Sequence, residues 1–338
     1  MTSNILSGST PSKTDYTLPT AFVTAFAASS SSQWVVGNNF GVVFDGASSP
    51  STPRYLAQDQ VWSIAGSSGS VAISTSIGTI LVFDPYPAAL QETINSSNGK
   101  LALSTDGGVL GAFANINLGN DETLNFYSLP SGNVIQSFPN TTGSSPVLTY
   151  FTLAASGGTI GRSLLPCYHC YSRQVTPIAG TPVIWSDSGS TLLIGLIPPP
   201  ISLSPDGTLV AVYNAPRSST SVTSIYKNGT LVTAVPGAVV GWIDNARLLV
   251  NQYGANGCLG CTIYSSAGAA LATPSLPELQ SIQTVNSDSV YDPVSNEIHS
   301  RTTSQPTWTA SYPSSSVGAV SGAYVVYESG HSVVVESY

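Results

Sequence analysis

The sequence predicts an all-β repeat fold, and three observations lead to this prediction. Residues 201–213 alternate apolar and polar side chains, turn at Pro205-Asp206-Gly207 and alternate again, which is the pattern of a β-hairpin. Looser copies of this hairpin recur, with turns near residues 31, 68, 107, 157, 206, 245 and 292, roughly 37 to 50 residues apart. No segment has a sustained apolar period of 3.6 residues. A repeat of about 40–45 residues with three or four strands is typical of the blades of a β-propeller.

The chain divides into an arm and one large domain. Residues 1–20 are polar, contain Pro11 and Pro19, and predict an N-terminal arm with one short strand near Tyr16. Residues 21–338 predict a single β-propeller domain made of antiparallel blades with three to four strands each.

Strands are expected in successive groups along this domain. The first four groups cover 22–26, 33–36 and 41–45; then 61–64, 70–73 and 79–84; then 100–104, 109–113, 123–127 and 134–138; then a group from 147 to 194 with a long irregular stretch. The later groups cover 201–213, 221–226 and 231–235; then 239–243, 248–250, 261–264 and 268–272; then a weaker unit at 290–298 and a terminal pair at 323–328 and 331–336.

These groups predict seven blades, with eight as the alternative if the pair at 323–336 forms a blade of its own. An open ring would present an unpaired strand edge. We therefore expect a strand of the N-terminal arm to complete the sheet begun by the C-terminal strands. The same strand could instead pair with a neighbouring molecule.

The hairpin at 201–213, with its Ser-Pro-Asp-Gly turn, resembles the first hairpin of WD-repeat-like and TolB-type propeller blades. The resemblance is carried by Leu103–Gly107 and Leu203–Gly207, while most of the chain shares only the periodicity. The Gly-His and Trp-Asp dipeptides of true WD repeats are absent, which argues against a WD-scaffold function. The resemblance implies a propeller fold and, as one alternative, an envelope-associated binding module.

Charged residues are scarce. They make up 8% of the chain, against about 25% in a typical soluble domain, and the net charge is −8. An acidic chain with nine Lys and Arg cannot neutralise many phosphates, so no nucleic-acid partner is expected. No apolar run approaches the length of a membrane span, and no membrane insertion is expected. The abundant Ser, Thr, Gly and Asn are commoner on secreted, cell-surface and virion proteins.

The N-terminus has neither the basic region nor the apolar region of a signal peptide. We therefore expect either that a leader has been removed or that the protein leaves the cell by another route, such as in a virus particle. With few carboxylates to protonate, the folded state should tolerate acid.

Four cysteines form two Cys-x-x-Cys pairs, Cys167 with Cys170 and Cys258 with Cys261. The prediction is two local disulfides in an oxidising setting. A shared four-thiolate metal site and free thiols are the alternatives. Neither pair has the helical context of a redox motif, and the residue after each second cysteine is not the histidine of a haem attachment site.

Other candidate residues have simple interpretations. Asn95, Asn140 and Asn228 begin glycosylation sequons. His169, His299 and His331 are expected to be ordinary surface residues, and Asp106, Asp206 and Asp244 to be turn residues. Three further carboxylates, Asp45, Asp84 and Asp187, end predicted strands and could face a central channel. The tryptophans at 34, 62, 185, 242 and 308 are expected to pack between blades.

No catalytic motif, cofactor site or metal site is predicted. The favoured hypothesis is a non-enzymatic extracellular or virion-surface propeller that recognises a protein or glycan, with self-assembly through residues 1–20 into a filament or array. One alternative is a propeller enzyme, either a metal-assisted lactonase or a polysaccharide lyase. The other is a TolB-like envelope module.

Overall fold

The computed structural model describes a chain of strands. It describes residues 13–17, 23–30, 33–38, 43–45, 61–67, 70–83, 90–95, 101–115, 122–139, 147–167, 170–179, 183–190, 201–213, 220–274, 276, 278–279, 282–286, 289–292, 295, 297–300, 306–309, 319–321, 324–329 and 332–338. Every regular element in these residues is a β-strand, so the prediction of an all-β fold is confirmed. Within them there is no helix of the length and apolarity that a membrane crossing requires.

The strands form antiparallel sheets in which consecutive strands are neighbours. The first half of the chain contains β2 (Val23–Ser30), β3 (Gln33–Asn38) and β4 (Val43–Asp45); β5 (Val61–Gly66), β6 (Val71–Thr75), β7 (Thr79–Phe83) and β8 (Leu90–Asn95); β9 (Leu101–Leu103), β10 (Val109–Asn115), β11 (Glu122–Ser128) and β12 (Asn133–Pro139); and β13 (Val147–Leu153), β14 (Thr159–Cys167), β15 (Cys170–Pro177) and β16 (Trp185–Ser190).

The second half continues this pattern and ends with the only sheet that mixes the two chain ends among the described strands. It contains β17 (Ile201–Leu203), β18 (Leu209–Tyr213), β19 (Val222–Lys227) and β20 (Thr230–Pro236); β21 (Ala238–Trp242), β22 (Arg247–Gly254), β23 (Gly257–Ser265) and β24 (Ala270–Ala272); β25 (Gln283–Asn286), β26 (Ser289–Asp292), β27 (Glu297–Ser300) and β28 (Pro306–Thr309); and β29 (Ala319–Ser321), β30 (Tyr324–Ser329) and β31 (Ser332–Ser337) with β1 (Lys13–Thr17).

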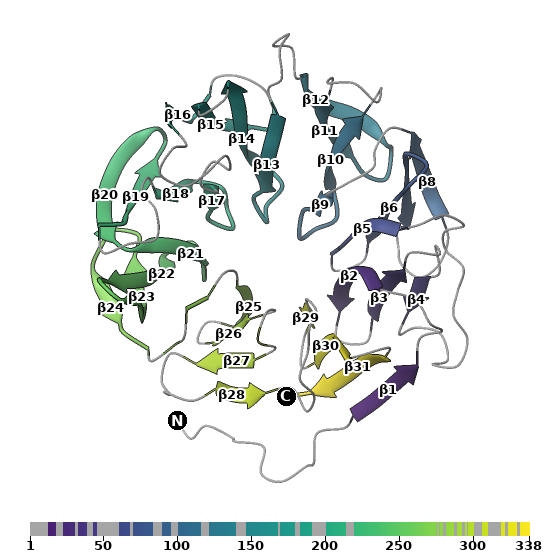
Figure 1. Ribbon diagram of the computed structural model, residues 1–338. Helices are drawn as coiled ribbons and strands as arrows, with labels where there is room; N and C mark the ends of the chain where they lie inside the picture. Colours follow the sequence, from purple (N-terminus) through teal and green to yellow (C-terminus); the bar gives the residue numbers. More distant parts are fainter. Residues whose placement is uncertain are drawn as a thin grey trace.

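Figure 1 shows these sheets side by side around a central opening, with the earliest strand of a sheet inside and the latest outside. The sheet that contains both chain ends differs, because β29 is its innermost strand and β1 its outermost. The described strands form eight sheets, not the seven counted from turns. The difference arises at the last sheet, where β29 and β30 join between Ser321 and Tyr324. The two residues between them in the sequence, Gly-Ala, lack the Asp or Asn that marks most of the other inner turns, so the turn count missed this hairpin.

The strands from β17 to β20 show why these residues form a sheet. Ile201–Leu203 pairs with Val210–Val212 around a turn in which Gly207 has φ +74°, a conformation that favours glycine. The next strand pair, β19–β20, turns through Asn228 (φ +49°) and Gly229 (φ +79°). Two adjacent residues with positive φ are the mark of the two-residue hairpin that an Asn-Gly pair predicts.

The hydrophobic core lies between neighbouring sheets. One cluster joins Ala72, Ile80 and Val82 of one sheet to Leu110 and Ala112 of the next. Further clusters of the same kind join β11 to β13 and β14, β15–β16 to β17–β18, β18–β20 to β21–β23, and β26–β27 to β30–β31. The side chains in these clusters therefore pack against an adjacent sheet, as the face-to-face stacking of propeller blades requires.

Candidate assembly site

Two of the inner hairpin turns are stabilised by hydrogen bonds between a serine and an aspartate. Ser104 Oγ donates to Asp106 Oδ1 at 2.6 Å, and the Gly108 backbone donates to the same oxygen at 3.0 Å. These two bonds, the Ser104 bond first, hold the pKa of Asp106 below its ordinary value. Ser204 and Asp206 repeat the arrangement one hundred residues later, with Thr208 as a further donor.

The pKa of Asp206 is also lowered. Burial alone would raise this pKa, but the hydrogen bonds from Ser204 and Thr208 together outweigh that effect. Asp244 behaves in the same way, because its bonds to Arg247 and to the Ala246 backbone outweigh burial. The interpretation of Asp106, Asp206 and Asp244 as turn residues is therefore correct.

Three consecutive inner turns are each also bonded to the turn of the next sheet. The Thr105 backbone donates to Ala155 O at 2.8 Å, the Ser156 backbone to Pro205 O at 2.9 Å, and the Asp206 backbone to Asn245 Oδ1 at 2.9 Å. These links run in one direction around the opening. The turns therefore connect successive sheets.

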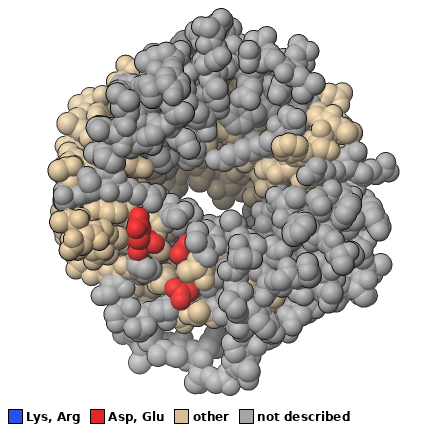
Figure 2. Space-filling view, viewed as in Figure 1, with Lys and Arg blue, Asp and Glu red and all other residues tan. Residues whose placement is uncertain are grey.

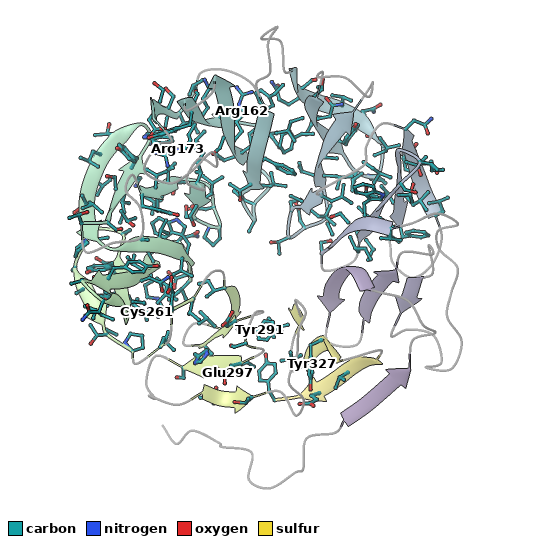
Figure 3. All side chains as sticks on the ribbon, viewed as in Figure 1. Arg162, Arg173, Cys261, Tyr291, Glu297 and Tyr327 are labelled. Carbon is teal, nitrogen blue, oxygen red and sulfur yellow. The ribbon has the colours of Figure 1, made fainter. Side chains whose placement is uncertain are left out.

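Asp187 does not face the opening as a free carboxylate. It accepts a bond at 2.9 Å from Nε of Arg173, and Nη2 of the same guanidinium donates to its other oxygen. Arg173 is completely buried and also donates to Tyr213 O at 3.3 Å, which lies on the next sheet. Figure 3 shows Arg173 between its strand and the neighbouring sheet. Asp45 ends β4, its side chain is outside the described set, and Asp84 lies outside the described residues.

The two cysteine pairs differ. Cys167 and Cys170 are directly opposed in the β14–β15 ladder, across a two-residue connection. Cys258 and Cys261 are not joined to each other, so the predicted disulfide between them is not formed in the structure. The Cys261 thiol is buried and donates to Asn251 Oδ1 at 3.1 Å, while Cys258 Sγ accepts from the Gly260 backbone at 3.4 Å.

Burial, with smaller contributions from Cys258 and Glu278, raises the pKa of Cys261 to about 12. A thiol with such a pKa is a poor source of thiolate at neutral pH. Cys261 thus has the role of a small buried side chain that holds Asn251, which in turn bonds both backbone groups of Leu279.

The sequons and the remaining aromatic and histidine residues occupy varied positions. Asn95 and Asn228 are exposed, and Asn140 lies outside the described residues. His299 is buried with 4% exposure, so the expectation of a surface residue is wrong for it; His169 and His331 lie outside the described residues. Among the tryptophans, 185 and 242 are buried as predicted and 62 is half exposed. The side chains of Trp34 and Trp308 are outside the described set.

His299 shares one face of β26–β27 with two carboxylates. Glu297 Oε2 lies 3.3 Å from His299 Nε2, and Asp292 is the register partner of Glu297. Burial lowers the pKa of His299, and the two carboxylates oppose this effect. No group of three or more His, Cys, Asp and Glu with metal-binding geometry occurs among the residues the structure describes.

The sheet that contains both chain ends has a different polar group. Glu336 on β31 is 1% exposed and accepts a hydrogen bond at 2.7 Å from the Tyr327 hydroxyl of β30. Tyr327 packs in one cluster with Tyr291 of the neighbouring sheet, and Figure 3 shows the two side chains close together. Burial, Asp292 and Tyr327 raise the pKa of Tyr291, in that order. Glu336 therefore sits at the edge of a buried aromatic cluster.

The strand β1 lies on the outer side of β31, with Lys13 opposite Glu336 and Thr17 opposite Ser332. This ladder is continuous over its five pairs. In contrast, the outer strands β8, β12, β20, β24 and β28 each carry a register shift one or two residues after they begin. Such bulges twist a sheet edge and disturb its ladder. The ladder of β31 with β1 is regular, as are those of β15 with β16 and of β3 with β4.

Sequence reasoning identified the arm and missed Glu336 and Tyr327. The available signal was the run Ser-Val-Val-Val-Glu-Ser at 332–337, in which Glu336 is the one charged residue of a strand with high β-propensity. A second missed signal is an aromatic residue at the last or next-to-last position of the third strand in several sheets. These residues are Phe83, Tyr127, Tyr226 and Tyr264. Each stands opposite the first or second residue of an outer strand.

The described charges that are visible on one face of the ring are acidic. Figure 2 shows them gathered over the sector that contains β21 to β28, beside the central opening. No described Lys or Arg is visible on that face. The face therefore presents a weakly negative sector on a surface that is otherwise uncharged where it is described.

Comparison with known proteins supports the fold and goes no further. No protein-family model and no curated protein matches the sequence. Among solved structures, the chain is similar to the computationally designed protein Ika8, with 13% identity, a TM-score of 0.65, and coverage of 95% of this chain and 98% of that one.

It is also similar to BamB from Moraxella catarrhalis, a β-propeller, with 11% identity, a TM-score of 0.57, and coverage of 97% of this chain and all of that one. At these identities the likeness concerns the fold alone. The predicted resemblance to β-propeller repeat proteins is confirmed at that level.

Proposed function

We propose that this protein is a non-enzymatic propeller of an extracellular or virion surface, that it recognises a protein or glycan there, and that it assembles by exchange of its N-terminal strand. In this proposal the eight sheets are eight blades, and β1 completes the last of them. The chain then consists of the arm, residues 1–20, and a single β-propeller domain, residues 21–338.

The observation that supports assembly is the position of β1. This strand is the outermost member of the sheet β1-β31-β30-β29 and is the part of that sheet that comes from the other end of the chain. A strand at a sheet edge can come from the same molecule or from a neighbour without any change in the ladder. Each backbone hydrogen bond in such a ladder contributes about 0.5–1.5 kcal/mol.

The surface supports an extracellular setting. The charge content is 8%, and the hydroxyl-rich turns rely on Ser-to-Asp bonds in place of ion pairs. Cys167 and Cys170 are register partners, and directly opposed residues of an antiparallel ladder lie within the Cα separation that a disulfide spans. We propose a disulfide there and glycans on Asn95 and Asn228, both exposed.

The assembly proposal is tested by cross-linking within the ladder. Thr14 and Val335 are register partners, so the double variant Thr14→Cys/Val335→Cys should form a disulfide between β1 and β31 under mild oxidation. If strands are exchanged, a non-reducing gel shows dimers and longer multimers that collapse to monomer on reduction. Thr14→Cys alone is the matched control for the native cysteines.

Deletion of residues 2–20 gives a second readout. Light scattering of the full chain should show large particles, and the deleted chain should be monomeric. A full chain whose double-cysteine variant is cross-linked only within single molecules, and whose particle size is unchanged by the deletion, would leave recognition without assembly.

A further inference from the structure

The strand β31, which pairs with β1, contains a buried charge, Glu336. Along β31, Val334 and Glu336 share the face that is buried against the neighbouring sheet, and each is 1% exposed. Val334 belongs in an apolar cluster. A carboxylate at the equivalent position costs free energy unless hydrogen bonds or a cation stabilise it.

One stabilising group is the Tyr327 hydroxyl, at 2.7 Å from Glu336 Oε1. On the side of β31 away from β30 lies the strand that comes from the N-terminal arm, and Lys13 is the register partner of Glu336 there. Directly opposed residues of an antiparallel pair lie on the same face of the sheet, and opposite charges in that position stabilise the pair. The chain has nine Lys and Arg in 338 residues, so a cation opposite this carboxylate is a rare coincidence of composition.

The role of the pair of Glu336 and Lys13 follows from what β31 would be without β1. β31 would then be an edge strand of sequence Ser-Val-Val-Val-Glu-Ser with a regular ladder, which is a template for unspecific pairing. An inward-pointing charge on an edge strand is a recognised protection against such pairing, because an incoming strand must bury it. For an incoming strand with a lysine opposite that charge, burial of the carboxylate does not carry this free-energy cost, because the lysine stabilises it.

We propose that Glu336 is the specificity-determining residue of the edge that receives β1, and that it selects the N-terminal strand of this chain, or of a second copy, through Lys13. The proposal names the recognition rule of the assembly suggested above and rests on that function only where the second copy is concerned. The rule applies equally when β1 pairs within its own chain.

Charge reversal tests the rule in the full-length protein. The variants Lys13→Glu and Glu336→Lys each oppose like charges, and the double variant restores an opposite pair with reversed polarity. We expect amide hydrogen exchange at residues 13–17 to be faster by about tenfold or more in each single variant. Protection should return in the double variant. Lys227→Glu, at the exposed end of β19, has the same change in net charge as Lys13→Glu and should leave this protection unchanged.

If a charge-reversal variant fails to fold, Glu336→Gln still tests the proposal. It keeps the shape and an acceptor for Tyr327 but removes the charge, so it should fold and should lose discrimination: its edge should protect the arm of the Lys13→Glu variant as well as that of the wild type. A double charge reversal that is no better protected than the worse single variant would overturn the proposal, as would a Glu336→Gln edge that still discriminates.

Mixing separates this inference from assembly. The arm of the Lys13→Glu chain matches the edge of the Glu336→Lys chain, so a mixture of the two should form mixed particles that neither forms alone. If the double variant recovers its protection but the mixture stays monomeric, the recognition rule holds and strand exchange does not occur. If the double variant does not recover, the rule is wrong whatever the particle size.

Discussion

Single hydroxyl groups and glycines stabilise turns in this protein, where ion pairs would do so in more highly charged proteins. Ser204 donates to Asp206 at 2.7 Å and accepts from the Leu209 backbone at 3.0 Å, so one side chain closes both sides of a turn. The adjacent Gly207 then lies against Thr159 of the preceding sheet. The close approach of successive turns therefore depends on a residue without a Cβ atom.

Gly207→Ala should destabilise the protein through two separable effects. The position has φ +74°, and an added Cβ atom would lie 2.6 Å from Thr159 Oγ1 and 2.7 Å from Thr159 Cβ. Gly78→Ala is the matched control, because Gly78 has φ +79° but nothing within 4 Å of an added Cβ atom. We expect the control to cost about 1 kcal/mol and Gly207→Ala to cost about 2–4 kcal/mol. Urea denaturation measures both, and equal losses would contradict the packing argument.

His299 should make stability depend on pH below neutrality. Its pKa is lowered by burial, so between the ordinary value of 6.5 and the lower folded value the unfolded chain binds more protons than the folded chain. The stabilisation is complete above pH 6.5 and is lost as the pH falls through the folded pKa. In His299→Gln the decrease in unfolding free energy between pH 7 and pH 5 should be smaller than in the wild type, whatever the variant's stability at pH 7. An unchanged slope would mean that His299 does not titrate in this range.

At the level of strands and sheets, polar links cross from one sheet to the next at few places, and the Arg173 guanidinium is the most buried of those described. It binds Asp187 within its own sheet and Tyr213 O on the next, and it lies 5.0 Å from the Tyr171 ring and 5.6 Å from the Trp185 ring. Removing the partner of a buried charge is strongly destabilising, whereas replacing both members with apolar residues is often neutral.

Asp187→Ala should therefore lower the unfolding free energy by about 3–5 kcal/mol. The double variant Arg173→Met/Asp187→Leu should recover most of that loss, because no uncompensated charge stays buried. Thermal or denaturant unfolding of the wild type and the two variants measures these differences in unfolding free energy. The interpretation is wrong if the double variant is less stable than Asp187→Ala.

Sequence patterns predicted most of the sheets because their information is local. The alternation in 201–213 and the Asn-Gly pair at 228–229 each specify a hairpin without reference to the rest of the chain. Local patterns could not by themselves place β1 beside β31, since that pairing joins residues more than 300 positions apart. The unpaired strand edge that an open ring would leave predicted it, and the structure contains this pairing. Local patterns also could not show that Glu336 and His299 are buried, because burial depends on the neighbouring sheet and not on the strand's own alternation.

For the whole molecule, scarcity of charge has two consequences. Long-range repulsion between copies is weak, so a surface strand or an apolar side chain meets little electrostatic opposition when two molecules approach. The exposed apolar residues of the outer strands, Val134 and Leu231 among them, then depend on the bulges beside them to prevent unspecific pairing. Specific contact is left to an edge with a regular ladder.

The second consequence is tolerance of acid, which we expect of the folded ring. When the carboxylates are protonated, nine Lys and Arg and three His are the positive charges on 338 residues, so self-repulsion stays small.

Three turn aspartates with lowered pKa values, Asp106, Asp206 and Asp244, stabilise the fold above their ordinary value of 3.8 and cease to do so as the pH falls below it. Asp106 and Asp206 are exposed and Asp244 is partly exposed, so their loss should be modest. The melting temperature at pH 4 should therefore lie within about 10 °C of its value at pH 7, with a steeper decline below pH 3.8. Asp106→Asn/Asp206→Asn should flatten that decline. A collapse of the fold well above pH 4 would show that buried groups such as His299 control the acid limit in place of the turns.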